Sequence, residues 1–464
     1  MSYSRQDLSD TIVALATPPG SGALGIIRLS GPQAISIVDS VFKGKNLSAQ
    51  ESHSIHFGHI HDEQQRLIDE VLASLFVAPR SYTGENIVEV SCHGSDYIIQ
   101  QLIQLFIREG ARLAQPGEFT MRAFLNGKMD LSQAEAVADL IASKSESAHQ
   151  IAMQQMRGGF SKEIQRLRQE LIDFASLIEL ELDFGEEDVE FANREDLRQL
   201  VSKIQGLLRR LIESFQLGNA IKNGISTVIA GRPNAGKSTL LNALLNEERA
   251  IVSNIAGTTR DTIEEELNIQ GVRFRLIDTA GIRDAQDQIE AIGVAKTLEK
   301  IRQSTLLVYV FDILDTPPEA VQADIASLQN EGLQILIVAN KMDLNPYNPP
   351  EAYYNDDIRP EQFLTASAIH KMNIPYLKEK LYQTAIAHRL DQAATVVSSS
   401  RHYEALLQAK ERLDAVAQGL NSGLTGDFIA MDIRQALFHL GEITGEISAD
   451  DLLGNIFGRF CIGK

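Results

Sequence analysis

The stretch Gly231-Arg232-Pro233-Asn234-Ala235-Gly236-Lys237-Ser238 limits what this chain can fold into more than any other feature. It directly follows the apolar run Ile225 to Ala230, so it predicts a strand, a glycine-rich loop and a helix in that order. Backbone N–H groups of such a loop surround phosphate oxygens, Lys237 reaches the β- and γ-phosphates, and Ser238 binds Mg²⁺. The positive end of the helix dipole adds to this attraction. The complete spacing predicts a nucleoside triphosphate site.

Two segments farther along identify the base. Asn340-Lys341-Met342-Asp343 follows a predicted strand, Gln334 to Val338. A carboxylate at Asp343 accepts two hydrogen bonds from the guanine edge, which adenine does not present. Ala366-Ser367-Ala368 follows a last strand, Phe363 to Thr365, and its backbone is expected to meet the guanine carbonyl. The predicted base is therefore guanine.

Two other segments are expected to contact the γ-phosphate and its metal. Asp278-Thr279-Ala280-Gly281 follows the strand Val272 to Ile277, so Asp278 can reach Mg²⁺ through water and the Gly281 N–H can meet the γ-phosphate. The hydroxyl-rich loop Ser253 to Asp261 is suited to close over both. All these segments come in the order of a GTPase, which is the predicted activity.

The residue that activates the attacking water is less usual. Many GTPases carry a glutamine directly after the Asp-x-x-Gly element, but this chain has Ile282, which cannot orient water. One candidate is Glu290, a short distance downstream. The other is a large monovalent cation held by the Asn234 side-chain oxygen and by backbone carbonyls at Ser253 and Ile255, since its charge could replace that of an arginine finger.

Length and charge limit the remaining possibilities. With 464 residues the chain is too long for one core, so several domains are expected. It carries 43 Lys and Arg against 62 Asp and Glu, a net charge of −19, which argues against nucleic-acid binding driven by bulk electrostatics. Two cysteines far apart in sequence indicate no disulfide framework, and no run reaches the length of a membrane span. These features predict a cytoplasmic protein.

Residues 1–120 are predicted to form a small α/β domain. Short apolar runs bounded by Gly, Pro and Ser predict strands, and helical spacing follows them; the strands are Ile12–Ala16, Gly25–Leu29, Val71–Val77 and Ile87–Cys92, the helix is Tyr97–Arg108, and 44–54 is a surface loop. Arg28 and Glu89 interrupt two of these strands, and simple alternation would place both on the solvated face of a sheet.

Helical spacing dominates on both sides of the nucleotide-binding segment. A capping-box spacing at Ser132 to Glu135 predicts the start of a long helix. Apolar seams predict packed helices at Ile164, Leu167, Leu171, Phe174 and Ile178 and again at Leu406, Ala409, Leu413, Val416 and Leu420. We therefore expect a helical domain, residues 121–219 and 378–464, split by a GTPase domain at 220–377 with a central β-sheet. The acidic run Glu179 to Glu190 is predicted to be a solvated turn instead of a metal site, because no His or Cys accompanies it.

Taken together, these motifs resemble one family. The Pro-Pro-Gly-x-Gly element at 18–22, the split helical domain, the phosphate loop, the segment Gly257 to Asp261 and the ending Phe460-Cys461-Ile462-Gly463-Lys464 resemble the bacterial tRNA-modification GTPases of the MnmE (TrmE) family. The resemblance covers essentially the whole chain. It implies that residues 1–120 form a domain that binds 5-formyl- or 5,10-methylene-tetrahydrofolate and holds two chains together as a homodimer.

The family also implies roles for individual residues. Folate contacts are implied for Arg28, Glu89, Lys128 and Lys464, Mg²⁺ ligands for Ser238 and Thr259, K⁺ ligands for Asn234, Ser253, Ile255 and Thr258, and water orientation for Glu290. GTP and GDP contacts are implied for Asn234, Ala235, Gly236, Lys237, Ser238, Thr239, Ser253, Asn254, Ile255, Ala256, Gly257, Thr258, Thr259, Asp278, Thr279, Ala280, Gly281, Asn340, Lys341, Asp343, Ser367 and Ala368. Lys237, Glu290 and Cys461 are the implied catalytic residues.

Two interpretations stay open for Cys461. A thiol close to Lys464 could act as a nucleophile or acid in the modification, as the family implies, or it could be a buried structural thiol in a tail docked into the helical domain. Cys92 lies in a predicted strand and is expected in the core.

The resemblance implies a potassium-activated GTPase with a FAD-containing partner of the MnmG (GidA) type, the two forming a heterotetramer. FAD would be held by that partner alone. Together they would add an aminomethyl or carboxymethylaminomethyl group to carbon 5 of the wobble uridine (U34) of certain tRNAs, with folate as carbon source. Two alternatives are a GTP-switched RNA or ribosome-assembly factor, which would need a basic RNA-binding module, and a folate-dependent one-carbon transferase with a regulatory GTPase domain.

Overall fold

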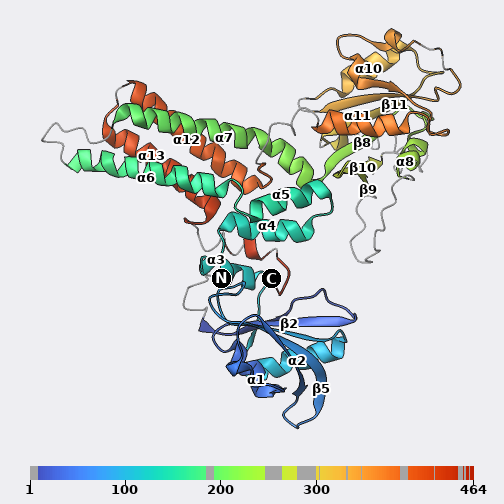
Figure 1. Ribbon diagram of the computed structural model, residues 1–464. Coiled ribbons are helices and arrows are strands. Elements are labelled where there is room, and N and C mark those ends of the chain that lie inside the picture. Colours follow the sequence, from blue (N-terminus) through green and yellow to red (C-terminus); the bar gives the residue numbers. More distant parts are fainter. Residues whose placement is uncertain are drawn as a thin grey trace. The chain divides into compact units, whose positions relative to one another are not determined.

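A computed structural model describes residues 9–183, 193–245, 264–278, 299–302, 304–330, 333–345, 347, 349–386, 396–422, 424–447, 453, 456–458 and 460–463 (Figure 1). The chain divides into two compact units. One comprises residues 1–141, 155–200 and 411–464, and the other comprises 142–154 and 201–410. Each unit is described separately below.

The first unit begins with a seven-stranded sheet in the order β3-β4-β5-β6-β2-β1-β7. Its strands are β1 (Ile12–Leu15), β2 (Leu24–Ser30), β3 (Phe42–Lys43), β4 (Ser54–His61), β5 (Leu67–Phe76), β6 (Ile87–His93) and β7 (Arg112–Leu113). The helices α1 (Ala34–Val41) and α2 (Asp96–Arg108) bury their apolar sides on one face of the sheet. The four predicted strands and the predicted helix α2 are confirmed. The pattern missed α1, β3, β4 and β7.

The predicted surface loop 44–54 is not entirely a loop. It contains the short 3-10 helix η2 (Leu47–Ala49), and Leu47 is 1% exposed in the domain core. The Asn46 side chain accepts a hydrogen bond from the Ala49 N–H, and the Asp39 carboxylate accepts one from the Leu47 N–H at 2.7 Å. A single leucine among polar residues gives no periodic signal, so the sequence pattern could not show it.

Helices make up the rest of the first unit. They include α3 (Glu118–Leu125), α4 (Leu131–Ala142), α6 (Ser161–Asp183) and α13 (Gly426–Thr444), with parts of α5 (Glu146–Met156), α7 (Arg194–Asn223) and α12 (Ser400–Ser422). α6 packs along α13. Both predicted apolar seams are buried except at Phe174, which is half-buried. The predicted helices are thus confirmed, while the division into units assigns 142–154, 201–219 and 378–410 to the second unit.

Two details of the helical prediction were wrong. The capping box of α4 is Asp130 with Gln133, not Ser132 with Glu135: Asp130 Oδ1 accepts from the Gln133 N–H and Gln133 Oε1 accepts from the Asp130 N–H, both at 2.9 Å. The Ser132 hydroxyl instead donates to Asp130, and the helix has only 12 residues. The acidic run begins inside α6, which continues to Asp183; its residues 184–190 lie outside the described part.

The second unit contains a six-stranded sheet in the order β13-β12-β11-β8-β10-β9, parallel except for the antiparallel pair β9–β10. Its strands are β8 (Ile225–Gly231), β9 (Glu264–Ile269), β10 (Val272–Asp278), β11 (Leu306–Asp312), β12 (Gln334–Asn340) and β13 (Phe363–Thr365). α8 (Lys237–Leu245) and α11 (Ile374–Ile386) pack on one face and α10 (Pro318–Leu328) on the other. This is the predicted inserted domain with a central sheet. Among the described helices, none is long and apolar enough to cross a membrane.

Candidate functional site

The glycine-rich loop has the expected context between β8 and α8. Gly231 and Gly236 have φ angles of +145° and +88°, which disfavour any side chain. A Cβ atom at Gly231 would lie 1.9 Å from the Val310 carbonyl oxygen, so only glycine fits beside β11. Asn234 has a φ of +60°, and its side chain is exposed on the loop. The loop therefore presents backbone N–H groups and the Asn234 amide at the start of α8.

Lys237 lies inside this loop. Its Nζ donates hydrogen bonds to the carbonyl oxygens of Gly231 at 3.0 Å and Arg232 at 2.7 Å, and the residue is 8% exposed. A cation held by the backbone of a glycine-rich loop is suited to bind phosphate oxygens. Ser238 and Thr239 are exposed in the first turn of α8.

A partly buried polar pair fixes the outer side of the loop. Arg232 Nε donates to Asp324 Oδ2 of α10 at 2.8 Å, and Arg232 Nη2 contacts the Ala320 carbonyl oxygen at 3.3 Å. The Tyr309 hydroxyl also donates to Asp324. Burial and then the Asp324 carboxylate raise the pKa of Tyr309 above its ordinary value. The Arg232 backbone, which holds Lys237, is thereby fixed to α10.

Asn340 joins three segments that are distant in sequence. Its Nδ2 donates to the Ala235 carbonyl oxygen at 2.8 Å, and its Oδ1 accepts from the Ala368 N–H at 3.0 Å. Asn340 is 3% exposed, so these bonds are sheltered from water. Lys341 Nζ pairs with Asp312 at 2.5 Å. The phosphate loop and the predicted base-binding segments therefore form one connected site.

Asp343 lies at the base-binding end of this site. Its Oδ1 is buried and accepts no hydrogen bond from any described residue, while its Oδ2 lies 3.6 Å from His370 Nε2. A buried carboxylate oxygen without a donor is costly, and a ligand with paired N–H donors would satisfy it. The guanine edge offers such donors, so the residues present fit the predicted base.

Part of the predicted site lies outside the described residues. This applies to Ser253, Asn254, Ile255, Ala256, Gly257, Thr258, Thr259, Thr279, Ala280, Gly281, Glu290 and Lys464, and to the side chain of Asp278 at the end of β10. Where the structure describes the chain, no three His, Cys, Asp or Glu side chains lie close enough together to hold a metal ion.

The N-terminal sheet carries a second candidate site at Arg28. Arg28 and Glu89 are direct neighbours on β2 and β6, and their side chains, 21% and 25% exposed, form an ion pair at 2.8 Å. The guanidinium lies 5.8 Å from the Tyr82 ring centroid and 5.6 Å from that of Phe119. Alternation correctly separated both charged side chains from the core under α1 and α2, but their face is not simply solvated, because buried Ala14 and Phe119 lie beside Arg28.

The described C-terminal tail meets the same site. Arg28 Nη1 contacts the Gly463 carbonyl oxygen at 3.3 Å. Gly463 has a φ of +100°, and a Cβ there would lie 2.1 Å from the Leu15 carbonyl oxygen, so glycine is required. Ile462 bridges to Pro116. Lys128 Nζ donates to the carbonyl oxygen of Pro79 at 3.0 Å. Pro79 precedes Lys128 by 49 residues and lies in the same loop as Tyr82.

The structure corrects one of the two interpretations of Cys461. The thiol is exposed, so it is not a buried structural group. The Cys461 carbonyl oxygen accepts a hydrogen bond from the Gly117 N–H at 3.4 Å, while the tail is anchored earlier by Leu453 and Phe457 in an apolar cluster with α3 and α4. Cys92 is 1% exposed as predicted, and burial, with a smaller effect of Asp69, raises the pKa of its thiol to about 11.

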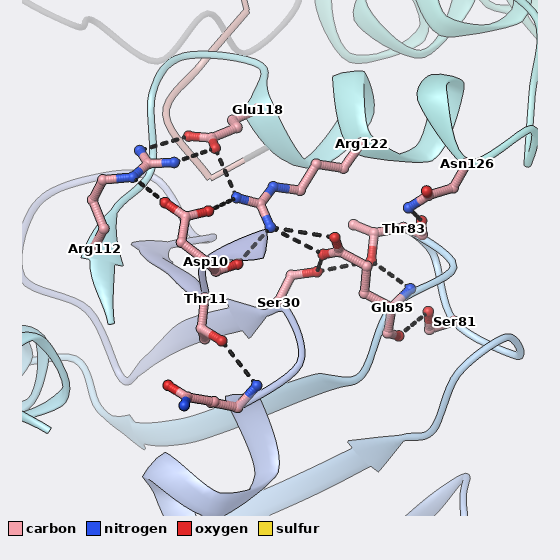
Figure 2. A network of polar contacts seen from close by, with 11 residues as sticks. Asp10, Thr11, Ser30, Ser81, Thr83, Glu85, Arg112, Glu118, Arg122 and Asn126 are labelled. Atoms are coloured by element: carbon pink, nitrogen blue, oxygen red, sulfur yellow. Dashed lines mark hydrogen bonds and ion pairs between the residues drawn. The ribbon is translucent and has the colours of Figure 1, made fainter. Parts of the chain in front are cut away.

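The sequence pattern did not predict a polar network around Arg122, in the same domain as the Arg28 site (Figure 2). Arg122 of α3 is fully buried and contacts three carboxylates: Asp10 Oδ1 at 2.5 Å, Glu118 Oε1 at 3.0 Å and Glu85 at 3.3 Å. Arg112 contacts Asp10 and Glu118 from the other side, each at 2.6 Å. The only signal in the sequence is an arginine within the run Phe119 to Phe124, where a solvated charge is the usual interpretation.

Sequence comparisons agree with this architecture. A model of the "MnmE helical domain" matches residues 131–461, and a model of the "GTP-binding protein TrmE N-terminus" matches residues 11–128. The chain is similar to three proteins called tRNA modification GTPase MnmE. The one from Cytophaga hutchinsonii is 55% identical over 98% of both chains. The one from Christiangramia forsetii is 57% identical over 98% of this chain and 100% of its own, and the one from Bacteroides fragilis is 49% identical over 98% and 99%.

Proposed function

The chain belongs to the MnmE family of tRNA modification GTPases, and from this premise we propose how its residues carry out the reaction. GTP hydrolysis in the service of tRNA modification is the family's activity. Membership argues against a ribosome-assembly factor, and we also favour a GTPase of tRNA modification over a transferase with a merely regulatory GTPase domain. The proposals below concern the cations, the folate, the thiol and the partners.

We propose that hydrolysis uses Mg²⁺ at Ser238 and Thr259 and K⁺ at Asn234, Ser253, Ile255 and Thr258. The observation in support is that Asn234 is exposed on the phosphate loop in a left-handed conformation beside Lys237. The cation would supply positive charge near the β/γ bond, and Glu290 would orient water where Ile282 cannot.

Exchange of K⁺ for Na⁺ tests this cation site. We expect hydrolysis to slow by roughly ten-fold or more in Na⁺, because a smaller ion fits poorly among oxygens spaced for a larger one. Steady-state rates at equal ionic strength and saturating Mg²⁺ measure the effect. GDP affinity in the two salts serves as control and should change little. Equal rates in both salts would remove the cation from the mechanism.

We further propose that tetrahydrofolate binds at Arg28, Glu89, Lys128 and Lys464. The pairing of Arg28 with Glu89, next to the Gly463 carbonyl and flanked by Tyr82 and Phe119, carries this proposal. A carboxylate can accept from the pterin N–H groups, a guanidinium can bind the glutamate carboxylates, and aromatic faces can pack on a pterin ring. Bound folate would bring a one-carbon group to the end of the chain that carries Cys461.

Replacing Arg28 by methionine tests the folate site. We expect the affinity for 5-formyl-tetrahydrofolate to fall about ten-fold, because a hydrogen bond to a charged group is lost. Isothermal titration of the full-length chain measures it. Arg66→Met removes a 72% exposed arginine of the same domain and should leave the affinity unchanged. An Arg28→Met variant that binds as tightly as the parent would contradict this assignment.

We propose that the exposed thiol of Cys461 takes part in the chemical step of the tRNA modification. We expect Cys461→Ser to lose the modified nucleoside while GTP hydrolysis continues, because the tail is remote in sequence from the phosphate loop and a hydroxyl is a much weaker nucleophile than a thiolate. Mass analysis of U34 from cells whose only copy carries this change measures the first effect. Full retention of the modified uridine would exclude a chemical role for the sulfur.

We also propose a homodimer and a flavoprotein partner of the MnmG type that holds FAD and forms a heterotetramer with this chain. The outer face of β4 and β5 supports the homodimer. Ile55, Phe57 and Leu72 are 66%, 60% and 45% exposed, and Phe57 lies directly opposite Leu72. Contiguous exposed apolar side chains on a sheet mark a surface that binds protein. Sedimentation of a Phe57→Asp variant tests this, since a dimer held by this face should dissociate.

A further inference from the structure

A short loop after β13 lies directly beside Asp343. Its ends are joined by two backbone hydrogen bonds: the Ser367 N–H donates to the Met372 carbonyl oxygen at 3.1 Å, and the Met372 N–H donates to the Ser367 carbonyl oxygen at 3.0 Å. Residues 368–371 lie between them. The Ala368 N–H is fixed as well, because it donates to Asn340 Oδ1 at 3.0 Å. The backbone of this loop is therefore held in place at the base-binding end of the site.

His370 belongs to this loop and has an exposed side chain. Its N–H donates to the Ser367 hydroxyl at 3.4 Å, so the backbone of the residue is anchored. The side chain is 62% exposed, and its Nε2 lies 3.6 Å from Asp343 Oδ2. Asp343 Oδ1, in contrast, is buried and accepts no hydrogen bond from a described residue. The imidazole thus flanks one oxygen of the carboxylate, and the other oxygen is left for a ligand.

The guanine edge has more donors than one bidentate pair with a carboxylate uses. It carries the N1–H and an exocyclic amine with two hydrogens. A carboxylate that accepts the N1–H on one oxygen and one amine hydrogen on the other leaves the second amine hydrogen without a partner. A histidine Nε2 is an acceptor when the ring proton is on Nδ1. The side chain that flanks Asp343 Oδ2 can therefore accept the remaining hydrogen.

We propose that His370 recognises the exocyclic amine of guanine together with Asp343, and so adds to the preference of this chain for guanine over hypoxanthine nucleotides. Asp343 Oδ1 accepts the N1–H, Oδ2 accepts one amine hydrogen, and His370 Nε2 accepts the other. Hypoxanthine lacks the amine, so it keeps the first of these bonds and loses the other two. The inference rests on the proposed guanine site and adds a second side chain to it.

The same position makes this recognition sensitive to pH. Histidine changes charge between about pH 5 and 8, and its protonated ring has donors but no acceptor. Asp343 is the charged group that pairs with His370 among the described residues. Lys341 of the same segment pairs with Asp312 instead, and Lys371 follows His370 in the loop. A protonated His370 competes with the amine for Asp343 Oδ2, so acid should weaken binding of guanine nucleotides more than that of hypoxanthine nucleotides.

Replacing His370 by alanine tests the inference. We expect the affinity for GDP to fall about five-fold, as for the loss of one hydrogen bond, while the affinity for inosine diphosphate stays within about two-fold. Competition against a fluorescent GDP analogue, with the full-length chain in Mg²⁺, measures both affinities. Thermal unfolding verifies the fold of the variant.

Replacing His370 by glutamine separates the acceptor from the titration. The glutamine side chain keeps an acceptor oxygen but does not titrate, so this variant should retain more of the preference for GDP than His370→Ala. Between about pH 8 and about pH 5.5 the preference of the parent should fall about three-fold, while that of His370→Gln should stay constant. His149→Ala removes an exposed histidine of α5 in the same unit and should change neither the affinities nor their pH dependence.

The outcomes separate this inference from the guanine site on which it rests. An unchanged ratio of the two affinities in His370→Ala, or an equal loss of both, would overturn the role of His370. A parent ratio that is the same at both pH values would overturn it too. If Asp343→Asn weakens GDP binding while His370→Ala keeps the parent ratio, only the role of His370 fails. If Asp343→Asn leaves GDP binding intact, the guanine site itself fails.

Discussion

GTP binding is expected to weaken by roughly 100- to 1,000-fold when Asp343 is replaced by asparagine. Asp343 Oδ1 is buried and accepts no hydrogen bond from the residues described here, so a guanine edge would satisfy it. Asparagine has one carbonyl oxygen and one NH₂ group where aspartate has two carboxylate oxygens. It can therefore accept only one of the two guanine hydrogen bonds, and its NH₂ group would face a guanine donor. Hydrogen bonds to a charged acceptor contribute about 1.5–3 kcal/mol each, which sets the size of the loss.

Xanthine nucleotides provide the matched measurement. Xanthine carries an oxygen where guanine carries its exocyclic amine, so the side-chain amide of the Asp343→Asn variant can donate to it, and binding of xanthosine diphosphate should improve as GDP binding falls. Competition against a fluorescent GDP analogue gives both affinities. Asp315→Asn, an exposed change in the same domain, is the control and should alter neither. Undiminished GDP affinity, or loss of GDP without gain of xanthosine diphosphate, would show that Asp343 does not read the base.

The parts of the site that are local in sequence were predictable. The phosphate loop can be recognised from eight consecutive residues, because its phosphate-binding N–H groups all come from one strand end, one turn and one helix start. The connection between the phosphate loop and the base-binding end of the site was not predictable. It depends on the hydrogen bond from Asn340 to Ala235, which are 105 positions apart, and a periodic sequence pattern contains no information about such a distant contact. The fold class followed from the order of strands and helices, whereas the start of α4 was misplaced, because Asp130 and Ser132 carry equally good capping side chains.

The tail shows a different limit. Its sequence ends in a motif that the family shares, yet only the three-dimensional contacts of Gly463 with Arg28 and Leu15 show where that motif lies. Arg122 is similar, because composition rules place an arginine on the surface. A buried charge is tolerated only where several partners converge, and these partners come from separate segments of the N-terminal domain.

Replacing Arg122 by methionine should destabilise the N-terminal domain by about 3–5 kcal/mol, because it removes the buried cation shared by Glu118, Glu85 and Asp10 and leaves only Arg112 beside the buried Glu118. Arg122 is fully buried, and Glu118 is 3% exposed. Methionine fills similar volume, so the loss reflects charge more than packing. Hydrogen exchange at β1 and α3 in the full-length chain, as a function of urea, measures the effect on this domain alone. The tail contact of Arg28 should loosen with it, since Phe119 beside Arg28 also lies on α3.

The pH dependence distinguishes lost charge pairing from lost packing. Burial alone raises the pKa of Glu118, but hydrogen bonds from Arg112, the Gln115 N–H and Arg122 outweigh burial and hold that pKa below its ordinary value of 4.5. A depressed pKa in the folded state stabilises the fold above pH 4.5, and this stability is lost as pH falls through the lower, folded value. The difference in stability between the parent and Arg122→Met should therefore be widest near neutral pH and shrink in acid, where protonation removes the negative charges that Arg122 pairs with in the parent. Arg166→Met, which removes an exposed arginine with two ion pairs in α6, should show little change at any pH. A gap for Arg122→Met that stays constant from pH 7 to pH 3 would identify lost packing as the cause.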